Sequence, residues 1–464
     1  MSQRTSARSW RPSRRALLES GAKATGLAAA AALLAGCGVG GGAGRDGAEV
    51  SDDDLAPWRE ADLDWEQQTG ASLVFGAQQH PWLQGVRGHL PVFEALTGIS
   101  VELQVSGESD FTTKLPVQLG GGSPTPDVFF IPSYPQYVAS RWIEPLRSYQ
   151  DDRDLTDRAF YAGDDLFDSA RSFVEWSDGR DYAVPITAEV QTVFYRSDLV
   201  GEDLASFAAL AAAAKEAKGD GIAGIAMRGK AEATMAWTCQ GFVFAHGGYV
   251  IDPSGRPAFD SPESITAVDS YASLLRDAGP PGAAAWDWQQ VNQAFEGRKA
   301  AMVIESSVFG AEYMDPESSR EADEVRAAPF PALDGELRPN FWHWVLGMNR
   351  RSKKKTAAWL FLQWATSPPT AALLAGAGVS VPRRSVWRAD SFRKRYPAHA
   401  ADVVLAMFGK ADSKPYDAFY LHPKWPEVGT LFASAMSSVI AGGATARDAM
   451  RRAQRRAEKV LGDG

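Results

Sequence analysis

From residue 71 onward, short apolar or alternating runs are interleaved with stretches in which apolar residues recur every three or four positions. Residues 72–75, 99–105 and 126–131 have the first pattern, which predicts strands. Residues 86–96 and 111–119 have the second pattern, which predicts helices. Strands and helices that alternate in this way are typical of an α/β fold with a mainly parallel sheet.

The later part of the chain continues this mixture and contains no visible internal repeat. Residues 182–198 are predicted to be extended, and residues 221–227 and 302–304 to form strands. Helical spacing predicts further helices at residues 204–218, 233–244, 264–278, 356–365 and 446–460. Thr445 is expected to cap the last helix, with Asp448 at its third position, and Pro368 to stop the preceding one. With 464 residues, the chain can form two domains or one large two-lobed body.

A separate leader precedes this body. Residues 1–23 contain six basic side chains, residues 24–35 are small and apolar, and Gly36-Cys37 follows. This layout is typical of a secretory signal, and the apolar run is shorter than the roughly 20 residues of a membrane-spanning helix. Residues 33–37 resemble the lipobox of bacterial lipoproteins, whose leader is cut before the cysteine and whose cysteine carries lipid. Cys37 is therefore the predicted lipidation site, at the outer side of the cell membrane.

The leader and the segment after it also suggest an export route and a tether. Residues 13–18, with the pair Arg14-Arg15, resemble a twin-arginine export signal, and general secretion stays an alternative. Residues 38–54 are rich in glycine and then in acidic side chains, a composition that cannot form a core. We therefore expect a signal peptide at residues 1–36, and the lipidated cysteine with a flexible tether at residues 37–70.

Charge and special residues exclude several classes of function. The chain carries a formal charge of −9, and its first 36 residues contain six basic side chains and one acidic, so the exported part carries about −14. That balance argues against nucleic acid or an anionic membrane surface as the main partner. Cys239 has no second cysteine besides Cys37, so a buried thiol is expected rather than a disulfide. The six histidines show no metal-ligand spacing, so no metal and no cofactor are expected.

Segments throughout the exported part resemble a known family. They are residues 126–130 with 142–146, 182–185 with 193–199, 247–263, 295–302, 358–364 and 381–383. In this order they are similar to the extracellular solute-binding proteins of sugar ABC importers, the group that includes maltose-binding protein, over about residues 71–462. One departure is Ser306-Ser307-Val308, where family members often have Gly-x-Trp, so the usual aromatic residue is absent there.

The resemblance implies two α/β lobes joined by a hinge, with a ligand clasped between them and no chemistry performed on it. Lobe 1 would comprise residues 71–185 and 342–395, and lobe 2 residues 186–341 and 396–464. The chain would cross near Pro185, near residues 332–341 and near Tyr396. Hinge closure on the ligand would present a docking surface to a membrane permease, and we expect the protein to be a monomer.

Fifteen tryptophans favour a sugar, oligosaccharide or polyol as the ligand, because indole faces stack on the C–H faces of sugars. Trp342 and Trp344, two apart on a strand, are expected to point to one face and His343 to the other. Trp237 and Gln240 share a helix face. The remaining candidate ligand groups lie at predicted strand ends, helix starts or crossings: Gln79, Asp110, Tyr134, Glu189, Gln191, Glu305, Ser306 and Arg384.

Other interpretations remain open at this stage. Arg384 keeps a phosphate ester such as glycerol phosphate as a possible ligand, and an acidic, aromatic cleft would suit a polyamine. An exported carbohydrate-active hydrolase would need two carboxylates about 5 to 10 Å apart. The sequence contains many acidic pairs, but no motif identifies such a pair, so an enzyme is not expected.

Overall fold

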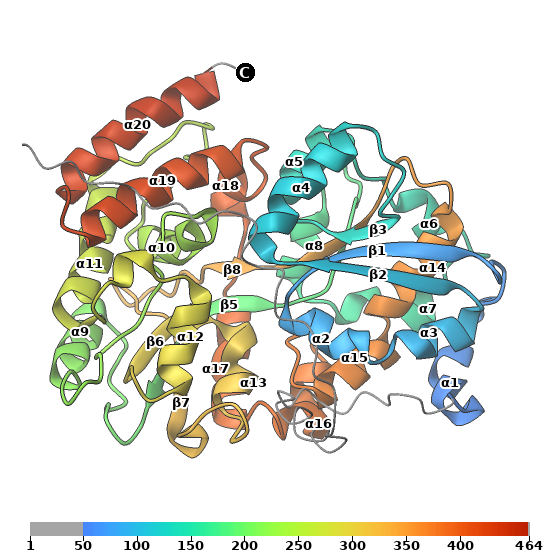
Figure 1. The fold of residues 1–464 in the computed structure, drawn as a ribbon, viewed down its shortest axis with the longest axis horizontal. Coiled ribbons are helices and arrows are strands. Elements are labelled where there is room, and N and C mark those ends of the chain that lie inside the picture. Colours follow the sequence, from blue (N-terminus) through green and yellow to red (C-terminus); the bar gives the residue numbers. More distant parts are fainter. Residues whose placement is uncertain (1–49, 463–464) are drawn as a thin grey trace, which may run out of the picture. The chain divides into compact units, whose positions relative to one another are not determined.

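The computed structural model describes residues 50–462, and these belong to one compact unit. The first of its two sheets has the strand order β2-β1-β3-β9-β4 (Figure 1). Its strands are β1 (Ser72–Gln78), β2 (Ser100–Ser106), β3 (Val128–Phe130), β4 (Val184–Pro185) and β9 (Val345–Met348). The strands β2, β1 and β3 are parallel, whereas β9 runs antiparallel to both β3 and β4. The prediction of α/β structure with parallel pairing is confirmed for this sheet.

Short helices surround the first sheet. They are α2 (Pro81–Arg87), α3 (Leu90–Thr97), α4 (Glu108–Gly120), α5 (Tyr134–Ala139), α6 (Arg147–Asp151), α7 (Arg158–Tyr161), α8 (Asp168–Val174), α14 (Lys355–Thr366), α15 (Pro368–Gly376) and α16 (Asp390–Arg393). The single helix predicted at residues 86–96 is divided into α2 and α3, because Pro91 can be accommodated only in the first turn of a new helix. Pro368 likewise begins α15 rather than simply ending α14.

The second sheet is built around β5 (Glu189–Arg196), which pairs with β6 (Met302–Ser306), β7 (Val325–Ala328) and β8 (Phe341–Trp342). All three pairings are antiparallel, so the expectation of mainly parallel sheet is wrong for this half. The predicted strand at residues 221–227 forms only the isolated parallel bridges Ala223–Ala300 and Ala226–Val303. Among the described residues, parallel pairing in this half is therefore limited to isolated bridges, the two beside β6 and Ser206–Ala332.

Further helices accompany the second sheet and include the longest in the described part of the chain. They are α9 (Phe207–Glu216), α10 (Ala233–Ala245), α11 (Pro262–Ala278), α12 (Trp288–Glu296), α13 (Gly310–Tyr313), α17 (Ala398–Phe408), α18 (Asp417–Tyr420), α19 (Trp425–Ile440) and α20 (Ala446–Gly462). The predicted cap of α20 is confirmed, because Thr445 Oγ1 accepts the Asp448 amide at 3.1 Å and donates to its carboxylate at 2.9 Å. Within residues 50–462, no helix combines the length and apolar character needed to cross a bilayer.

The segment predicted as a flexible tether is ordered from Ser51 onward, so its expected end at residue 70 is wrong. Ser51 caps α1 (Asp52–Arg59), whose apolar side chains Leu55 and Trp58 are buried. The Trp58 indole donates to Ser367 Oγ at 3.1 Å, which fixes α1 beside the start of α15. The signal peptide, Cys37 and the twin-arginine segment lie outside the described residues.

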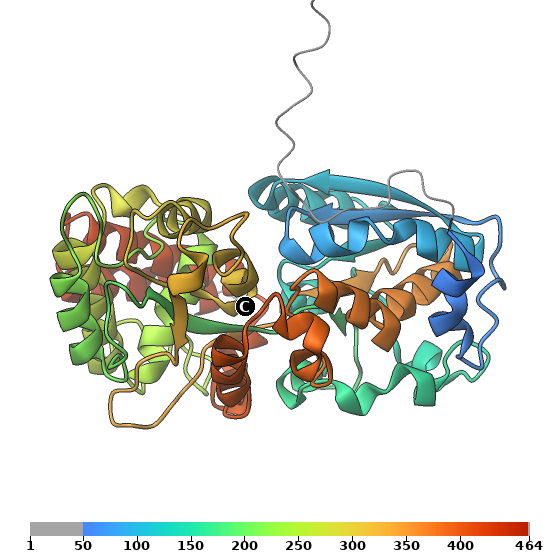
Figure 2. The same ribbon diagram turned by 90° about the horizontal axis from the view of Figure 1, so that it is seen from below.

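The chain passes between the two sheets in two short segments, each flanked by strands on both sides. Residues 186–188 connect β4 of the first sheet to β5 of the second (Figure 2). In the other direction, β8 pairs with β5, and only His343 and Trp344 separate it from β9. Near the third expected crossing, the Tyr396 hydroxyl donates to the Ser307 carbonyl oxygen at 3.0 Å. Residues at these passages are held where both halves of the protein meet.

Cys239 is a buried thiol, as predicted. It is fully buried in α10, and its sulfur lies 3.5 Å from the sulfur of Met436. Burial in this apolar setting raises the pKa of the thiol.

The Glu312 carboxyl in α13 provides a test of the packing beside β6. Burial, reinforced by Glu296 and Asp315, raises its pKa from 4.5 to about 7. A carboxyl whose pKa is higher in the folded state contributes stability below pH 4.5 that is lost as the pH rises through 7. Glu312→Gln should therefore increase the free energy of unfolding by about 1–2 kcal/mol at pH 8, and by much less at pH 4.5.

Urea unfolding at the two pH values measures this difference. Glu317→Gln, at an exposed position on the following turn, is the matched control and should have no such pH-dependent effect. Equal effects of Glu312→Gln at both pH values would contradict the account of Glu312.

Candidate functional site

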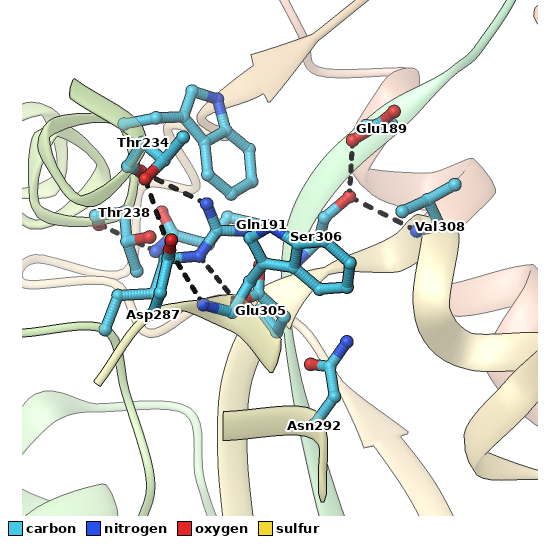
Figure 3. A network of polar contacts seen from close by, with 12 residues as sticks. Glu189, Gln191, Thr234, Thr238, Asp287, Asn292, Glu305, Ser306 and Val308 are labelled. Atoms are coloured by element: carbon cyan, nitrogen blue, oxygen red, sulfur yellow. Dashed lines mark hydrogen bonds and ion pairs between the residues drawn. The ribbon is translucent and has the colours of Figure 1, made fainter. Parts of the chain in front are cut away.

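A buried ion pair stands at the end of β6. Arg228 Nε donates to Glu305 Oε2 at 2.7 Å, its Nη2 donates to Glu305 Oε1, and its Nη1 donates to the Thr234 carbonyl oxygen at 3.2 Å (Figure 3). Glu305 is fully buried, and its Oε1 also accepts the Ser306 amide at 2.7 Å. Although burial alone would lower the pKa of Arg228, the Glu305 charge raises it above its usual value. The guanidinium is therefore charged, and these hydrogen bonds hold the pair in one orientation.

A second carboxylate, Glu189, lies beside this pair. Ser306 Oγ donates to Glu189 Oε2 at 2.8 Å (Figure 3). Ser306, which follows Glu305 in the chain, therefore links the Arg228–Glu305 pair to Glu189. Thr187 Oγ1 donates to Glu189 Oε1 at 2.9 Å, and His80 Nε2 lies 3.4 Å from the same oxygen. His80 Nδ1 accepts the Trp82 amide at 3.1 Å, which directs Nε2 toward Glu189. Glu189 at the start of β5 thus contacts groups from both sheets.

Glu108, at the start of α4, reaches the same region from the first sheet. Its Oε2 accepts the Trp288 indole N–H at 3.3 Å, and the Trp288 ring stacks on Phe309 at 5.4 Å. Burial raises the pKa of Glu108, Arg228 partly offsets this, and Asp287 adds to it. Arg228 is therefore surrounded by three carboxylates, so the centre is acidic although it contains a guanidinium.

Partly exposed indoles border these polar groups. The Arg228 guanidinium lies 5.8 Å over the Trp237 ring, and the Trp344 ring lies 5.7 Å from the His80 ring. Trp342 and Trp344 are 6.0 Å apart, which agrees with the expectation that they share a face. The Trp237 indole N–H is held by the Phe341 carbonyl oxygen at 3.3 Å. The structure thus gathers six of the predicted residues in one region, which we call the polar cluster: Glu189, Glu305, Ser306, Trp237, Trp342 and Trp344.

Gln191 and Gln240 are buried and hold α10 to the crossing strand. Gln191 Nε2 donates to the Thr238 carbonyl oxygen at 2.7 Å, and Gln240 Nε2 donates to Asn340 Oδ1 at 3.1 Å. A Cβ atom on Gly241 would lie 1.8 Å from Gln191 Oε1, so glycine is needed for this approach. These two buried amides therefore support the polar cluster, and within the described residues Gln240 Oε1 has no hydrogen-bond partner.

His343 and Tyr134 also have structural partners. Both ring nitrogens of fully buried His343 are bonded, Nδ1 to the Thr187 carbonyl oxygen at 2.7 Å and Nε2 to Ser169 Oγ at 3.1 Å. Burial lowers the pKa of His343 to about 4. The Tyr134 hydroxyl donates to the Val174 carbonyl oxygen inside the first half of the protein. We therefore omit both from the candidate site.

Three further predicted residues lie apart from the polar cluster. Asp110 is exposed and pairs with Lys114 one helical turn away, at 2.8 Å. Arg384 donates to the carbonyl oxygens of Asp164 and Leu166, and its Nη2 lies 2.9 Å from Asp168. The Gln79 side chain is exposed, whereas its neighbour His80 points inward.

Sequence reasoning missed several groups of the site: Glu108, Thr187, Arg228, Asp287 and Trp288. One of them follows from a rule that was already in use, since Arg228 comes directly after the run predicted as a strand at residues 221–227. Arg228 therefore lies at a carboxyl end, where ligands bind in open α/β sheets, and so does His80, two residues after β1. In the described part of the chain, no group of three His, Cys, Asp or Glu side chains could hold a metal ion.

Comparisons with known proteins show what the chain is similar to. A family model described as "Bacterial extracellular solute-binding protein" matches residues 67–372. The erythritol/L-threitol-binding protein of Mycolicibacterium smegmatis is 29% identical over 378 residues, covering 74% of this chain and 76% of the relative. The mannitol-binding protein of Pseudomonas aeruginosa is 29% identical over 343 residues, covering 68% of this chain and 75% of the relative.

A solved structure shares the fold. It is an ABC transporter solute-binding protein from Agrobacterium vitis S4 with bound D-mannitol, and it superposes with a TM-score of 0.75 at 26% identity. The match covers 85% of this chain and 99% of that protein.

The ion pair at the centre of the polar cluster can be tested by breaking it. Arg228→Met should leave Glu305 buried without a counter-charge and decrease the free energy of unfolding by about 3–5 kcal/mol. Arg228→Met combined with Glu305→Met should recover much of that loss, because no charge then remains unpaired. Urea unfolding measures the free energy of unfolding of Arg228→Met, Glu305→Met and the double variant. If the loss in the double variant equals the sum of the losses in the two single variants, the pair does not have the role assigned to it.

Proposed function

Because the chain belongs to the family of bacterial extracellular solute-binding proteins, we propose that its solute is a sugar-like compound, specifically an uncharged linear polyol, held at the polar cluster. The protein is a binding component of solute import outside the cytoplasm and not an enzyme. One arrangement carries this choice of ligand: carboxylates in fixed orientations, and a guanidinium whose charge is balanced by Glu305, lie between indole side chains. Neighbouring hydroxyls of a polyol each donate and accept a hydrogen bond, so they suit mixed groups of this kind.

The two relatives support a polyol more than an oligosaccharide. One is named for erythritol and L-threitol, the other for mannitol, and all three compounds are uncharged chains of hydroxyl-bearing carbons. Sequence Ser306-Ser307-Val308 lacks the aromatic residue often found at that point in the family. A linear polyol has no ring face that requires such a platform, which is consistent with its absence.

Charge makes the alternative ligands less suitable. A phosphate ester would meet Glu108, Asp287 and Glu305 around the single Arg228, so its negative charges would be repelled. A polyamine would need carboxylates free of cations, whereas Glu305 is already paired with Arg228. Arg384, which had kept the phosphate interpretation open, is occupied by backbone carbonyls and Asp168.

The lobe boundaries also remain part of the proposal. Lobe 1 would contain residues 71–185 and 342–395, and lobe 2 residues 186–341 and 396–464. Support comes from β4 and β9 pairing in the first sheet, and from β5 pairing with β6 and β7 in the second. The bond between Trp288 and Glu108 would then join the two lobes, as expected for a hinged protein that closes on its ligand before it meets a permease. We further propose that the protein acts as a monomer.

Attachment to the membrane through Cys37 is proposed from sequence alone. The small residues before Cys37 and the glycines after it support lipidation and a short leash, and Arg14-Arg15 supports twin-arginine export. A diacylglyceryl group would supply two acyl chains, which suffice for stable anchoring.

A ligand screen tests the substrate class. Erythritol, threitol, ribitol and mannitol should raise the thermal unfolding midpoint, because a ligand at 100 times its Kd stabilises the folded state by about 2.7 kcal/mol. Maltose, glycerol 3-phosphate and spermidine should raise it less. A shift with glycerol 3-phosphate or spermidine and none with any polyol would overturn the proposal.

Calorimetric titration with the polyol that binds then locates the site. Glu189→Gln and Trp344→Ala should each weaken binding by about tenfold or more, because one loses a charged acceptor and the other an apolar face. Asp110→Asn, at an exposed position outside the polar cluster, is the control and should bind as the wild type does. Unchanged binding in both site variants would move the ligand elsewhere.

Fractionation of cells tests the anchor. Cys37→Ser should release the protein from the membrane or leave its leader uncut, whereas Cys239→Ala should remain attached, because Cys239 is buried in α10. Membrane retention of the Cys37→Ser protein after leader removal would exclude the lipid anchor.

A further inference from the structure

The helix α20 carries an unusual concentration of positive charge on its exposed side. Six of its 17 residues are basic, and all six are exposed: Arg447, Arg451, Arg452, Arg455, Arg456 and Lys459. The helix contains two acidic residues, Asp448 and Glu458, so its net charge is +4. Figure 1 shows α20 on the outside of the protein, beside α19.

These basic side chains are not used by the protein itself. In the described part of the chain, none of the six has an ion-pair partner, although most of the ion pairs found there contain an arginine. Several of the six are spaced four residues apart along the helix, a spacing at which like charges repel. The helix packs instead through Ala449, Met450, Ala453 and Ala457, which are buried. The basic face is therefore dispensable for folding and slightly unfavourable within the isolated protein.

The positive face contrasts with the charge of the remaining chain. The exported part carries about −14 overall, so everything outside α20 is more acidic still. At physiological ionic strength, charges are screened over about 8 Å, so a surface that contacts α20 senses its local charge rather than the distant acidic groups. An anionic surface would attract α20 and repel the rest, and the protein would be oriented as well as attracted.

We propose that the basic face of α20 docks on the anionic phospholipid headgroups of the cell membrane, the same membrane to which the proposed lipid anchor on Cys37 would attach the protein. The apolar side of α20 is already buried, so the contact is electrostatic and reversible, without insertion into the hydrocarbon region. Arginine suits this role because its planar guanidinium binds phosphate oxygens bidentately. The proposal concerns orientation at the membrane and does not depend on which solute the polar cluster binds.

The experiment uses a chain that begins at Val50, because it lacks the basic leader and Cys37 yet contains the whole described unit. Its binding to phosphatidylglycerol vesicles and to phosphatidylcholine vesicles is measured by flotation at low and high salt. We expect binding to the anionic vesicles only, and its loss at high salt. Replacement of Arg451, Arg452, Arg455 and Arg456 by Gln should decrease the bound fraction roughly tenfold or more.

Two matched variants make the result specific. Gln replacements at Arg87, Arg153, Lys394 and Lys410 remove the same charge from exposed positions without ion pairs, and they should leave binding unchanged. Lysine replacements at the four α20 positions should preserve most of the binding. Absence of binding to phosphatidylglycerol, or an equal loss in the control at the other four positions, would overturn the proposal. Polyol titration of the same proteins reports separately on the solute site.

Discussion

The buried pair of Arg228 and Glu305 is the interaction on which the rest of the site depends. Burying two charges costs more than an ordinary surface pair can return, so the pair persists only because both partners are bonded further. Thr234 and the Ser306 amide supply those bonds. As a consequence, Glu305 is fixed in one orientation, Ser306 is directed toward Glu189, and the guanidinium is kept under the Trp237 ring. A cluster that is rigid before the ligand arrives loses less entropy on binding.

The crossing strands bring this centre into reach of both halves. Because β5 begins at Glu189 and β8 ends at Trp342, the residues that connect the sheets also carry the ligand-type side chains. Opposite them, Glu108 and His80 come from the first sheet and Trp288 from the second. Closure of the proposed lobes would therefore bring Glu108 and His80 from one side against Trp288 and Glu189 from the other. The acidic excess around Arg228 would favour the proposed uncharged solute over a phosphorylated one.

Sequence patterns were sufficient for local structure and for part of the site. The strand ending at Ser306 and the strand passing Glu189 could be recognised from their apolar runs, so the polar groups beside them were predicted. Arg228 follows a predicted strand, but its pairing with Glu305 could not be predicted, because the two residues are 77 positions apart and no local pattern links them. Gln191, Gln240 and His343 were predicted as ligand groups, but in the fold they bond to the Thr238 carbonyl oxygen, Asn340 Oδ1 and the Thr187 carbonyl oxygen. These partners become neighbours only in the fold, so no local pattern reveals them. The antiparallel pairing of β5 with β6 and β7 could not be predicted from local patterns either, because it depends on the direction in which the chain enters the second sheet.

A crystal structure of the protein with bound erythritol or mannitol tests the central claim most directly. The account predicts polyol hydroxyls within hydrogen-bonding distance of Glu189, Glu305 or Arg228, with the carbon chain against Trp237, Trp342 or Trp344. It also predicts that the Arg228–Glu305 pair is unchanged by the ligand. A polyol bound away from the polar cluster, or an Arg228 that leaves Glu305 to contact the ligand alone, would contradict the account.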